Sequence, residues 1–223
     1  MCIRDRYSPT SKSKIVRSHK RASYNKKELE AVLQDGYLCH VSYLFEGSPV
    51  IIPTAYGYEN GILYLHGAIK NRMLLSILDQ EQACVSVTHA DGMVLARSAF
   101  HHSFNYRSAV MFGHPRQITD ANEKNRVLQL ITENIIPGRW DEVRQPSPKE
   151  LDITLVVAID IKEASVKVRA GGPIDDDEDY ALPIWAGVLP THETFGAPIT
   201  DDKLTRDLPV PSSVKNIEKA QNG

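Results

Sequence analysis

Apolar residues recur at every second position in several short runs of the chain, and this alternation is typical of β-strands. In residues 83–88, for example, Ala83, Val85 and Val87 alternate with more polar neighbours. Residues 59–61 contain the Asn-Gly pair that favours a tight hairpin turn between two strands. Strands are predicted over residues 37–45, 50–58, 62–66, 83–88, 155–161 and 164–168, and the last two are expected to form a hairpin. Residues 93–95 and 104–112 are further strand candidates.

Three other segments have apolar residues three or four positions apart, which is the spacing of one face of a helix. Residues 26–35 follow Asn25, a residue type that caps helix N-termini well, and they stop at Gly36. Further helices are predicted over residues 69–78 and 120–136. The helices stand between groups of strands and do not alternate with single strands, so a parallel α/β sheet is disfavoured.

The fold class expected from this pattern is mainly β, with some α. Six or seven strands joined largely by hairpins, with peripheral helices, favour an antiparallel closed or split β-barrel. The barrel domain is expected over residues 24–170. Residues 1–23 are expected to be a disordered, basic arm whose first six residues are not native, and residues 171–223 an extended, Pro-rich strap.

Composition and charge narrow the function without naming it. The formal net charge is −2, so the chain is not a polycation of the kind that binds nucleic acid through charge alone. Hydrophobic residues make up 42% of the chain, as in an ordinary globular protein. No apolar run approaches the roughly 20 residues that span a bilayer, and the N-terminal residues lack the apolar core of a signal peptide. The three cysteines show no metal-binding or disulfide spacing. A cytoplasmic protein is expected, without nucleic-acid or membrane partners.

The junction after the strand at residues 62–66 carries the first candidate site. A strand ends at Gly67, and Lys70 and Arg72 flank Asn71 at the start of the next helix. Cations there face the positive end of the helix dipole, which is unfavourable. A bound anion would make the electrostatic energy of this site favourable. A phosphate would also accept hydrogen bonds from the free backbone N–H groups. The alternative, that both cations simply point to water, is equally compatible with this pattern.

Residues 95–110 form a second candidate site because they are dense in hydrogen-bonding side chains. Such density beside a core favours a polar ligand, or a dimer interface in which these groups pair. His101 and His102 are adjacent, so in a strand they would face opposite sides and would not easily bind one metal ion. No metal site is expected, and the acidic residues 175–179 are interpreted as a solvated run. Serine-hydrolase, phosphate-loop and dinucleotide motifs are absent.

Several of these segments resemble the pyridoxamine-phosphate-oxidase-like flavin-nucleotide-binding superfamily, and in particular the branch related to nitroimidazole-resistance proteins. The resemblance rests on residues 50–54 (Val-Ile-Ile-Pro-Thr), 96–108, 137–140 (Pro-Gly-Arg-Trp) and 182–187 (Leu-Pro-Ile-Trp-Ala-Gly). It implies a six-stranded split β-barrel and a homodimer with FMN bound between the subunits. The arginine-containing motif with which pyridoxamine phosphate oxidases hold their substrate is not recognisable in residues 214–223, so oxidation of vitamin B6 is not expected.

The same resemblance assigns roles to individual residues. It implies that cations after a barrel strand hold the flavin phosphate, that a neighbouring strand lines the ring, and that a second segment also contacts the cofactor. His66 is implied as the residue on the substrate side, in a catalytic position. The cofactor-binding residues are then Ile52, Pro53, Thr54, Gly67, Lys70, Asn71, Arg72, Asn105, Tyr106 and Arg107.

Two classes of function follow from these expectations. The first is an FMN-dependent oxidoreductase that acts on a small molecule, in which the flavin carries the electron chemistry. The second is a protein without catalytic activity that binds flavin or haem for storage or sensing, with His66, His101 or His102 as an axial haem ligand.

Overall fold

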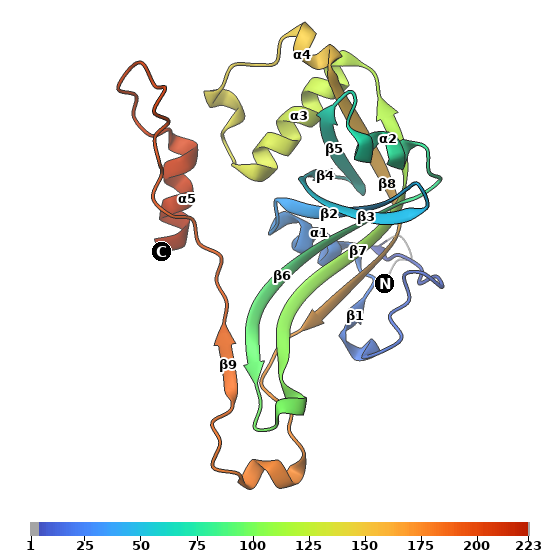
Figure 1. The fold of residues 1–223 in the computed structure, drawn as a ribbon, viewed down its shortest axis with the longest axis vertical. Helices are drawn as coiled ribbons and strands as arrows, with labels where there is room; N and C mark the ends of the chain where they lie inside the picture. The colour runs from blue at the N-terminus through green and yellow to red at the C-terminus, as the bar shows by residue number, and fades with distance from the viewer. Residues whose placement is uncertain (1–4, 223) are drawn as a thin grey trace.

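The computed structural model describes residues 5–222, and it describes side chains as far as Ile217. Within these residues the main feature is one antiparallel sheet of nine strands in the order β3-β2-β6-β7-β8-β5-β4, with β1 added beside β8 and β9 beside β6 (Figure 1). The strands are β1 (Ala22–Ser23), β2 (Leu38–Phe45), β3 (Ser48–Ala55), β4 (Gly57–Glu59), β5 (Ile62–Ala68), β6 (Ala83–Leu95), β7 (Ser103–Ile118), β8 (Thr154–Arg169) and β9 (Gly187–Pro190).

Helices cover the periphery of this sheet. Asn25 and Asn71 cap the first two helices, each accepting a hydrogen bond from a backbone N–H of the first turn. The helices are α1 (Lys26–Gln34), α2 (Arg72–Leu78), α3 (Ala121–Ile135), α4 (Pro148–Asp152) and α5 (Ser212–Asn222), with short 3-10 turns at η2 (His19–Arg21), η3 (Ala99–His101), η4 (Trp140–Glu142) and η5 (Asp177–Ala181).

The predicted fold class is confirmed. The structure is mainly antiparallel β with peripheral helices, and its six long strands, β2, β3, β5, β6, β7 and β8, correspond to the six strands of the expected split barrel. The three additional strands are short, between two and four residues each. The sheet is not closed, because β3 and β4 stand at its two ends without pairing with each other.

The predicted hairpin of residues 155–161 and 164–168 is wrong, because these residues form the single strand β8 of 16 residues. Phe112 of β7 pairs with Glu163 and the next residue, Gly113, pairs with Ile161, so Lys162 is an extra residue on β8. This is a β-bulge, which bends a strand without reversing it. The polar residues that suggested a turn therefore mark a bend.

Two other strand boundaries also differ from the prediction. Residues 83–88 and 93–95 belong to one strand, β6, whose register shifts between Ala90 and Gly92. The predicted strand over residues 50–58 is interrupted at Tyr56, whose buried hydroxyl donates to the carbonyl of Leu33 at 2.6 Å. The chain turns there from β3 at one edge of the sheet to β4 at the other.

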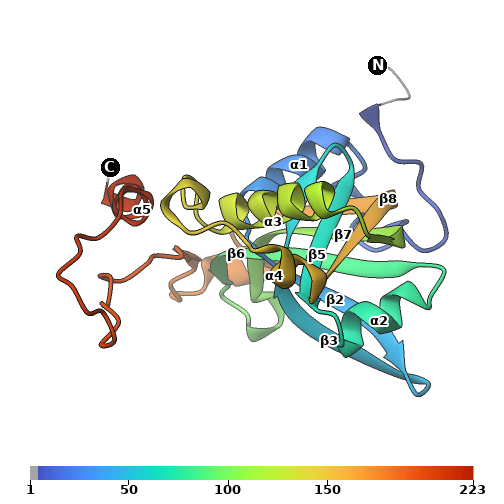
Figure 2. The same ribbon diagram turned by 90° about the horizontal axis from the view of Figure 1, so that it is seen from above.

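The sheet has a hydrophobic cluster on each face. Alternate residues of a strand point to opposite faces. We call one cluster inner, and it includes Leu29, Val41, Leu74 and Val157; the cluster on the opposite face is called outer. Strand β5 contributes Leu63 and Leu65 to the inner cluster and Tyr64 to the outer one. The outer cluster lies between the sheet and α3, which crosses the sheet in Figure 2. Its buried members are Tyr64, Ile118, Val127, Ile131, Val156 and Ala158.

The N-terminal arm, expected to be loose, packs against the body of the protein. Tyr7 is only 8% exposed and belongs to the inner cluster, and its N–H donates to the carbonyl of Tyr24 at 2.9 Å. Residues 1–4 of the six that we expected not to be native lie outside the described residues.

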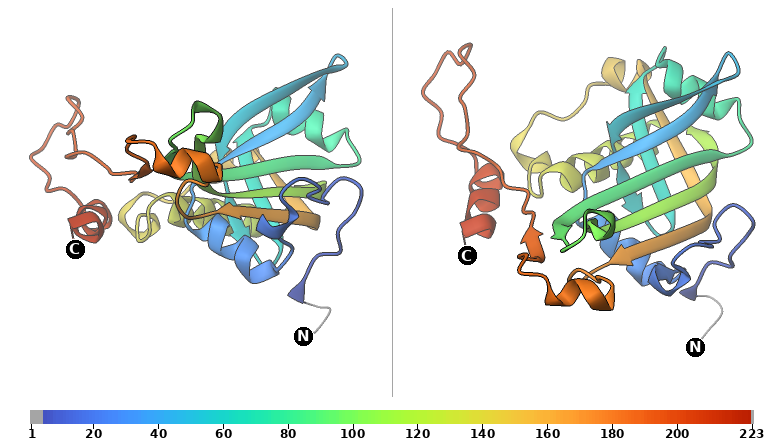
Figure 3. Two further views of the ribbon diagram at one scale, coloured as in Figure 1. Left: turned by 90° about the horizontal axis from the view of Figure 1, so that it is seen from below. Right: turned by 60° about the horizontal axis from the view of Figure 1, so that its bottom comes forward.

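The C-terminal segment runs along the side of the sheet as an extended chain (Figures 1 and 3). It contributes β9, which pairs with β6, and it ends in α5, a helix that the sequence analysis did not predict. Within the described part of the chain, none of the helices has the length and apolar character needed to span a bilayer.

We expect Gly113→Ala to destabilise the protein, because Gly113 lies at the bulge where β7 and β8 approach closely. A Cβ atom at this position would lie 2.4 Å from the backbone oxygen of Asp160, so the strands would have to separate. The expected loss is about 1–3 kcal/mol in the free energy of unfolding, measured by urea denaturation. Gly196→Ala is the matched control, because its Cβ would meet no atom within 4 Å. Equal stability of the two variants would contradict this prediction.

Candidate functional site

The predicted phosphate-binding junction lies between the end of β5 and the start of α2. Asn71 caps α2, since its side-chain oxygen accepts from the N–H of Leu74 at 3.1 Å. A Cβ atom on Gly67 would lie 2.9 Å from Nδ2 of Asn71, so the capping side chain occupies the space that the glycine leaves open. Gly67 and Asn71 therefore shape the junction, and the capping role of Asn71 is fully accounted for by the helix.

The two cations of this junction are both exposed. Lys70 lies in the turn before α2, and Arg72 is the first residue of the helix. The guanidinium of Arg72 lies 4.4 Å from the ring centre of Phe45 at the end of β2. This cation–π contact orients Arg72 while it leaves the N–H groups at its edge available to an anion.

The residues expected to line the flavin ring lie on β3, which is an edge strand. Ile52 and Pro53 are exposed and Thr54 is half-buried. Ile51 of the same strand is 63% exposed, although it is a large apolar residue. An edge strand has backbone N–H and C=O groups without strand partners, and here it also carries apolar side chains in contact with water.

His66 lies on the outer face of β5, the face that also carries Tyr64, and it pairs in register with Val156 of β8. Its Nδ1 atom is buried and has no hydrogen-bond partner within residues 5–222. Burial lowers the pKa of His66 below its ordinary value, so the neutral imidazole is the favoured form. A neutral imidazole nitrogen of this kind can accept a hydrogen bond or bind a metal ion.

The second predicted segment is at the start of β7, and its side chains are already engaged. Asn105 is 8% exposed, donates to the carbonyl of Gly171 at 3.1 Å and accepts from Arg169. Arg107 donates from Nε and Nη2 to Asp91, at 3.1 and 3.0 Å, and from Nη1 to Asp35. The hydrogen bond to Asp91 is the main cause that raises the pKa of Arg107. Tyr106 lies between these two residues in the sequence and is half-buried. It pairs with Arg169 in the sheet.

Within one chain the structure does not bring the two predicted segments together. Gly67 pairs with Leu155 at one end of β8, and Arg107 pairs with Val168 at the other end. A strand of 16 residues spans roughly 50 Å when extended, and Figure 1 shows α2 and the start of β7 at opposite ends of the molecule. One chain therefore keeps the two predicted segments apart, and we refer to each of them as a predicted half-site.

A buried ion pair, which no sequence pattern predicted, lies beside the second segment. Asp175 was interpreted as part of a solvated run, and this is wrong, because its side chain is fully buried. It accepts from Nη1 of Arg97 at 3.0 Å and from the N–H groups of Arg97 and Ser98. Burial raises the pKa of Asp175, but the hydrogen bonds from Arg97 and Ser98 outweigh burial and hold it below the ordinary value. The partners are 78 positions apart, so no local pattern could reveal them.

His101 lies beside two carboxylates and not beside a second histidine. Its Nε2 is 3.2 Å from Oδ2 of Asp176, and the ligand atoms of His101, Asp176 and Asp179 all lie within 4.8 Å of one another. The Nδ1 atom of His102 instead lies 3.0 Å from the carbonyl of Ser98. The expectation that the two histidines do not share one metal ion fits this geometry, and the absence of a metal stays a prediction.

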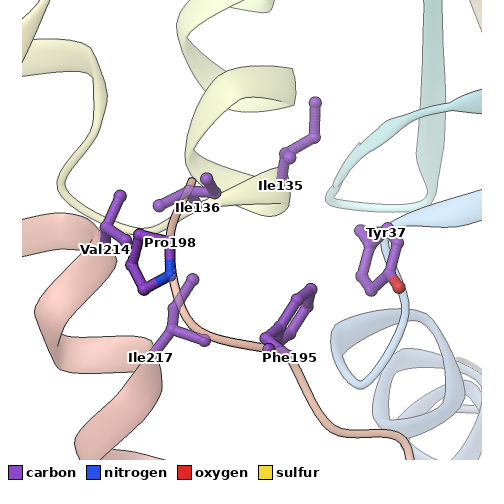
Figure 4. A pocket seen from close by; sticks show the side chains of 8 residues that line it. Tyr37, Ile135, Ile136, Phe195, Pro198, Val214 and Ile217 are labelled. Atoms are coloured by element: carbon purple, nitrogen blue, oxygen red, sulfur yellow. The ribbon is translucent and has the colours of Figure 1, made fainter. Parts of the chain in front are cut away.

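An apolar cavity of about 200 Å³ lies between the C-terminal segment and the end of α3. Figure 4 shows Ile135 at the end of α3 and the next residue, Ile136, on one side of the cavity, and Phe195, Val214 and Ile217 of the C-terminal segment on the other. None of the predicted site residues lines this cavity. Its lining offers few polar groups that could orient a polar ligand, so we do not assign it to the candidate site.

The chain is similar to solved structures over almost its whole length. A flavocytochrome from Azotobacter vinelandii is 34% identical with a TM-score of 0.88, covering 95% of this chain and 98% of that chain. An FAD and haem binding protein from Mycobacterium smegmatis is 37% identical with a TM-score of 0.83, covering 88% of this chain and 97% of that chain.

More distant structures share the fold alone. A protein from Bacteroides thetaiotaomicron, named for resistance to 5-nitroimidazole antibiotics, is 22% identical with a TM-score of 0.57, covering 66% of this chain and 86% of that chain. No curated protein sequence matches the chain.

A family model provides the assignment. The model described as pyridoxamine 5'-phosphate oxidase matches residues 25–168, which include every long strand of the sheet except the last residue of β8. The resemblance on which the sequence analysis relied is thereby confirmed, and the chain belongs to the pyridoxamine 5'-phosphate oxidase family.

Proposed function

We propose that this protein is a redox protein that binds a flavin nucleotide and a haem. The observation that carries the proposal is the near full-length similarity, at 34% and 37% identity, to a flavocytochrome and to an FAD and haem binding protein. The sequence resemblance implied FMN, whereas the Mycobacterium relative binds FAD. We therefore propose a flavin nucleotide, and mass analysis of the released flavin distinguishes FMN from FAD.

The half-site around Gly67 fits a flavin. Lys70 and Arg72 offer two exposed cations to a phosphate, and the neighbouring edge strand β3 offers backbone groups beside exposed apolar side chains. An isoalloxazine ring has the same mixed character, with an apolar body and a polar edge. These features support the assignment of Ile52, Pro53 and Thr54 to the ring and of the cations to the phosphate.

His66 fits an axial ligand of haem iron. Iron binds the neutral imidazole, and burial favours that form of His66. Its buried Nδ1 has no hydrogen-bond partner among the described residues, which is costly unless a ligand or a partner completes the site. The Nε2 of His101, by comparison, lies 3.2 Å from Oδ2 of Asp176, so a carboxylate of the chain already stands beside it. We therefore prefer His66 to His101 as the haem ligand.

The bound groups would supply the electron chemistry, since flavins carry one or two electrons and haem carries one. The chain would supply binding and environment: Lys70 and Arg72 would hold the phosphate, β3 would contact the ring, and His66 would hold the iron. Buried side chains of the outer cluster next to His66 would exclude water. An oxidoreductase acting on a small molecule remains part of the proposal, and storage or sensing without turnover is the alternative.

We also propose a homodimer, because one chain holds the two predicted half-sites at opposite ends of β8. A two-fold axis could place the Asn105 segment of one protomer beside the Gly67 junction of its partner. Exposed apolar residues on β3 and on the C-terminal segment, Ile51 and Trp185 among them, would be covered in such a dimer. A cytoplasmic location is proposed as well.

The protein purified after expression with a haem supply is expected to show both a flavin spectrum and a haem Soret band. His66→Ala should lose most of the Soret band and retain the flavin, because it removes only the proposed iron ligand. Absorption spectra and mass analysis of the released chromophores provide the measurement. A wild-type protein without colour would refute the proposed function.

Two histidine variants serve as controls for the ligand assignment. His101→Ala and His102→Ala remove the other two histidines considered as ligands, and both variants should keep the haem. Loss of haem in either of them, with haem retained in His66→Ala, would transfer the ligand role away from His66.

Replacement of both Lys70 and Arg72 by Ala is expected to weaken flavin binding strongly. Each charge-assisted hydrogen bond to a phosphate contributes about 1.5–3 kcal/mol, so the double variant should lose about 3–6 kcal/mol of binding free energy. Fluorescence titration of the protein stripped of flavin measures this loss. The control is the double variant of Lys203 and Arg206, two exposed cations of the C-terminal segment. An unchanged flavin affinity in a folded Lys70/Arg72 variant would exclude the phosphate assignment.

A further inference from the structure

Arg169, the last residue of β8, is a buried cation without a carboxylate partner. It is 6% exposed, and within residues 5–222 it forms no ion pair. Its hydrogen bonds go to neutral oxygens only: the side chain of Asn105 and the carbonyls of Gly171, at 3.3 Å, and Gly172, at 3.2 Å. A buried charge that lacks a counter-ion is costly in a folded protein. An anion bound beside Arg169 would therefore stabilise the folded state.

The guanidinium is also incompletely hydrogen-bonded. Its Nε atom is buried and has no partner in the described part of the chain. Guanidinium Nε and Nη groups together match the paired oxygens of a phosphate or carboxylate. One donor of Arg169 is therefore left for an acceptor that the chain itself does not provide.

A second arginine lies beside the first. Arg21 precedes β1, and the register of β1 on β8, with Ala22 opposite Lys167, carries Arg21 toward the end of β8. Both side chains line one cavity, and burial, together with the charge of Arg21, lowers the pKa of Arg169. Two like charges held close together repel, and an anion bound between them would offset this repulsion.

Arg21 and Arg169 line the same cavity, which has a volume of about 350 Å³. Its other lining residues are Val168, Ala170, Gly171, Gly172, Pro173 and Ile174, and none of the eight carries a negative charge. The backbone N–H groups of Gly171 and Gly172 form no hydrogen bond with any group in residues 5–222. Free amides of a glycine-containing loop are donors that phosphate-binding loops commonly use.

We propose that Arg21, Arg169 and the Gly171-Gly172 loop form a binding site for a phosphorylated ligand. The cavity falls in the size range of small-molecule sites, roughly 300–1,000 Å³, and it exceeds the space that one phosphate group needs. The ligand is therefore a phosphate or pyrophosphate group attached to a larger molecule. The site requires neither flavin nor haem at the residues proposed above.

Two sources would present the same phosphate chemistry. The group could belong to a separate phosphorylated metabolite, or to the phosphate-bearing end of a nucleotide cofactor, since Asn105, which bonds to Arg169, is one of the predicted cofactor-binding residues. Titration of the protein with inorganic pyrophosphate, once after removal of any cofactor and once with the cofactor bound, separates the two sources. A cofactor phosphate in the site would block the pyrophosphate, whereas a metabolite site would stay open.

The experiment is calorimetric titration of sodium pyrophosphate into the cofactor-free protein and its variants at low ionic strength. The wild type should bind one pyrophosphate per chain, and Arg21→Gln should weaken this binding about tenfold or more, as expected for the loss of one charge-assisted bond. Arg17→Gln is the matched control, because Arg17 is an exposed arginine of the same arm outside the cavity. It should change the affinity less than about twofold.

Arg169→Gln is a second variant, used with a thermal unfolding control because Arg169 is buried. Absence of saturable binding by the wild type, or an equal loss in Arg17→Gln and Arg21→Gln, would overturn the proposal. A colourless protein would refute the proposed flavin and haem function, but it would leave this test unaffected.

Discussion

The structure depends on the continuity of β8. This one strand pairs with β7 along most of its length, with β5 at one end and with β1 at the other. It also supplies residues to both hydrophobic clusters, as Val157 faces the inner cluster and Val156 the outer one. Because the bulge at Lys162 bends the strand without ending it, both halves of the sheet share one rigid backbone. The distance between the two half-sites of a chain is therefore fixed by the fold, and loop motion cannot close it.

Unsatisfied polar groups occur at both ends of this strand. His66 faces the outer cluster near the start of β8, and Arg169 lies at its end, and each has a buried nitrogen without a partner among residues 5–222. Two further buried nitrogens lack a hydrogen-bond partner in the same residues, Nε of Arg97 and Nε2 of His101, but each of these side chains lies beside a carboxylate, Asp175 or Asp176. His66 and Arg169 form no ion pair with a carboxylate in the described residues, so the hydrogen-bonding capacity at the two ends of β8 is the part that a polar ligand would satisfy.

Local patterns in the sequence predicted the elements but not their long-range partners. Alternation and the Asn-Gly turn identified most of the long strands, and helical spacing with the cap at Asn25 identified the first helices, because these signals act within a few residues. The bend at Lys162 was interpreted as a turn, since a bulge and a hairpin both place polar residues between apolar runs. Asp175 and Arg169 were missed for a different reason. Their roles arise from contacts with Arg97, 78 positions away, and Asn105, 64 positions away, which no spacing rule encodes.

The half-sites differ in how much of their chemistry one chain completes. At the Asn105 segment, Arg107 already donates hydrogen bonds to Asp91 and Asp35. It is therefore better suited to positioning neighbouring side chains than to binding a ligand. At the Gly67 junction, Lys70 and Arg72 are exposed and the adjacent edge strand is unpaired. An exposed cation pair beside an apolar edge gains most when a ligand brings both a phosphate and a flat apolar surface, because each feature alone would stay hydrated. The proposed flavin meets both requirements with one molecule, which is why we locate its phosphate and ring at this junction and assign the Asn105 segment a supporting role.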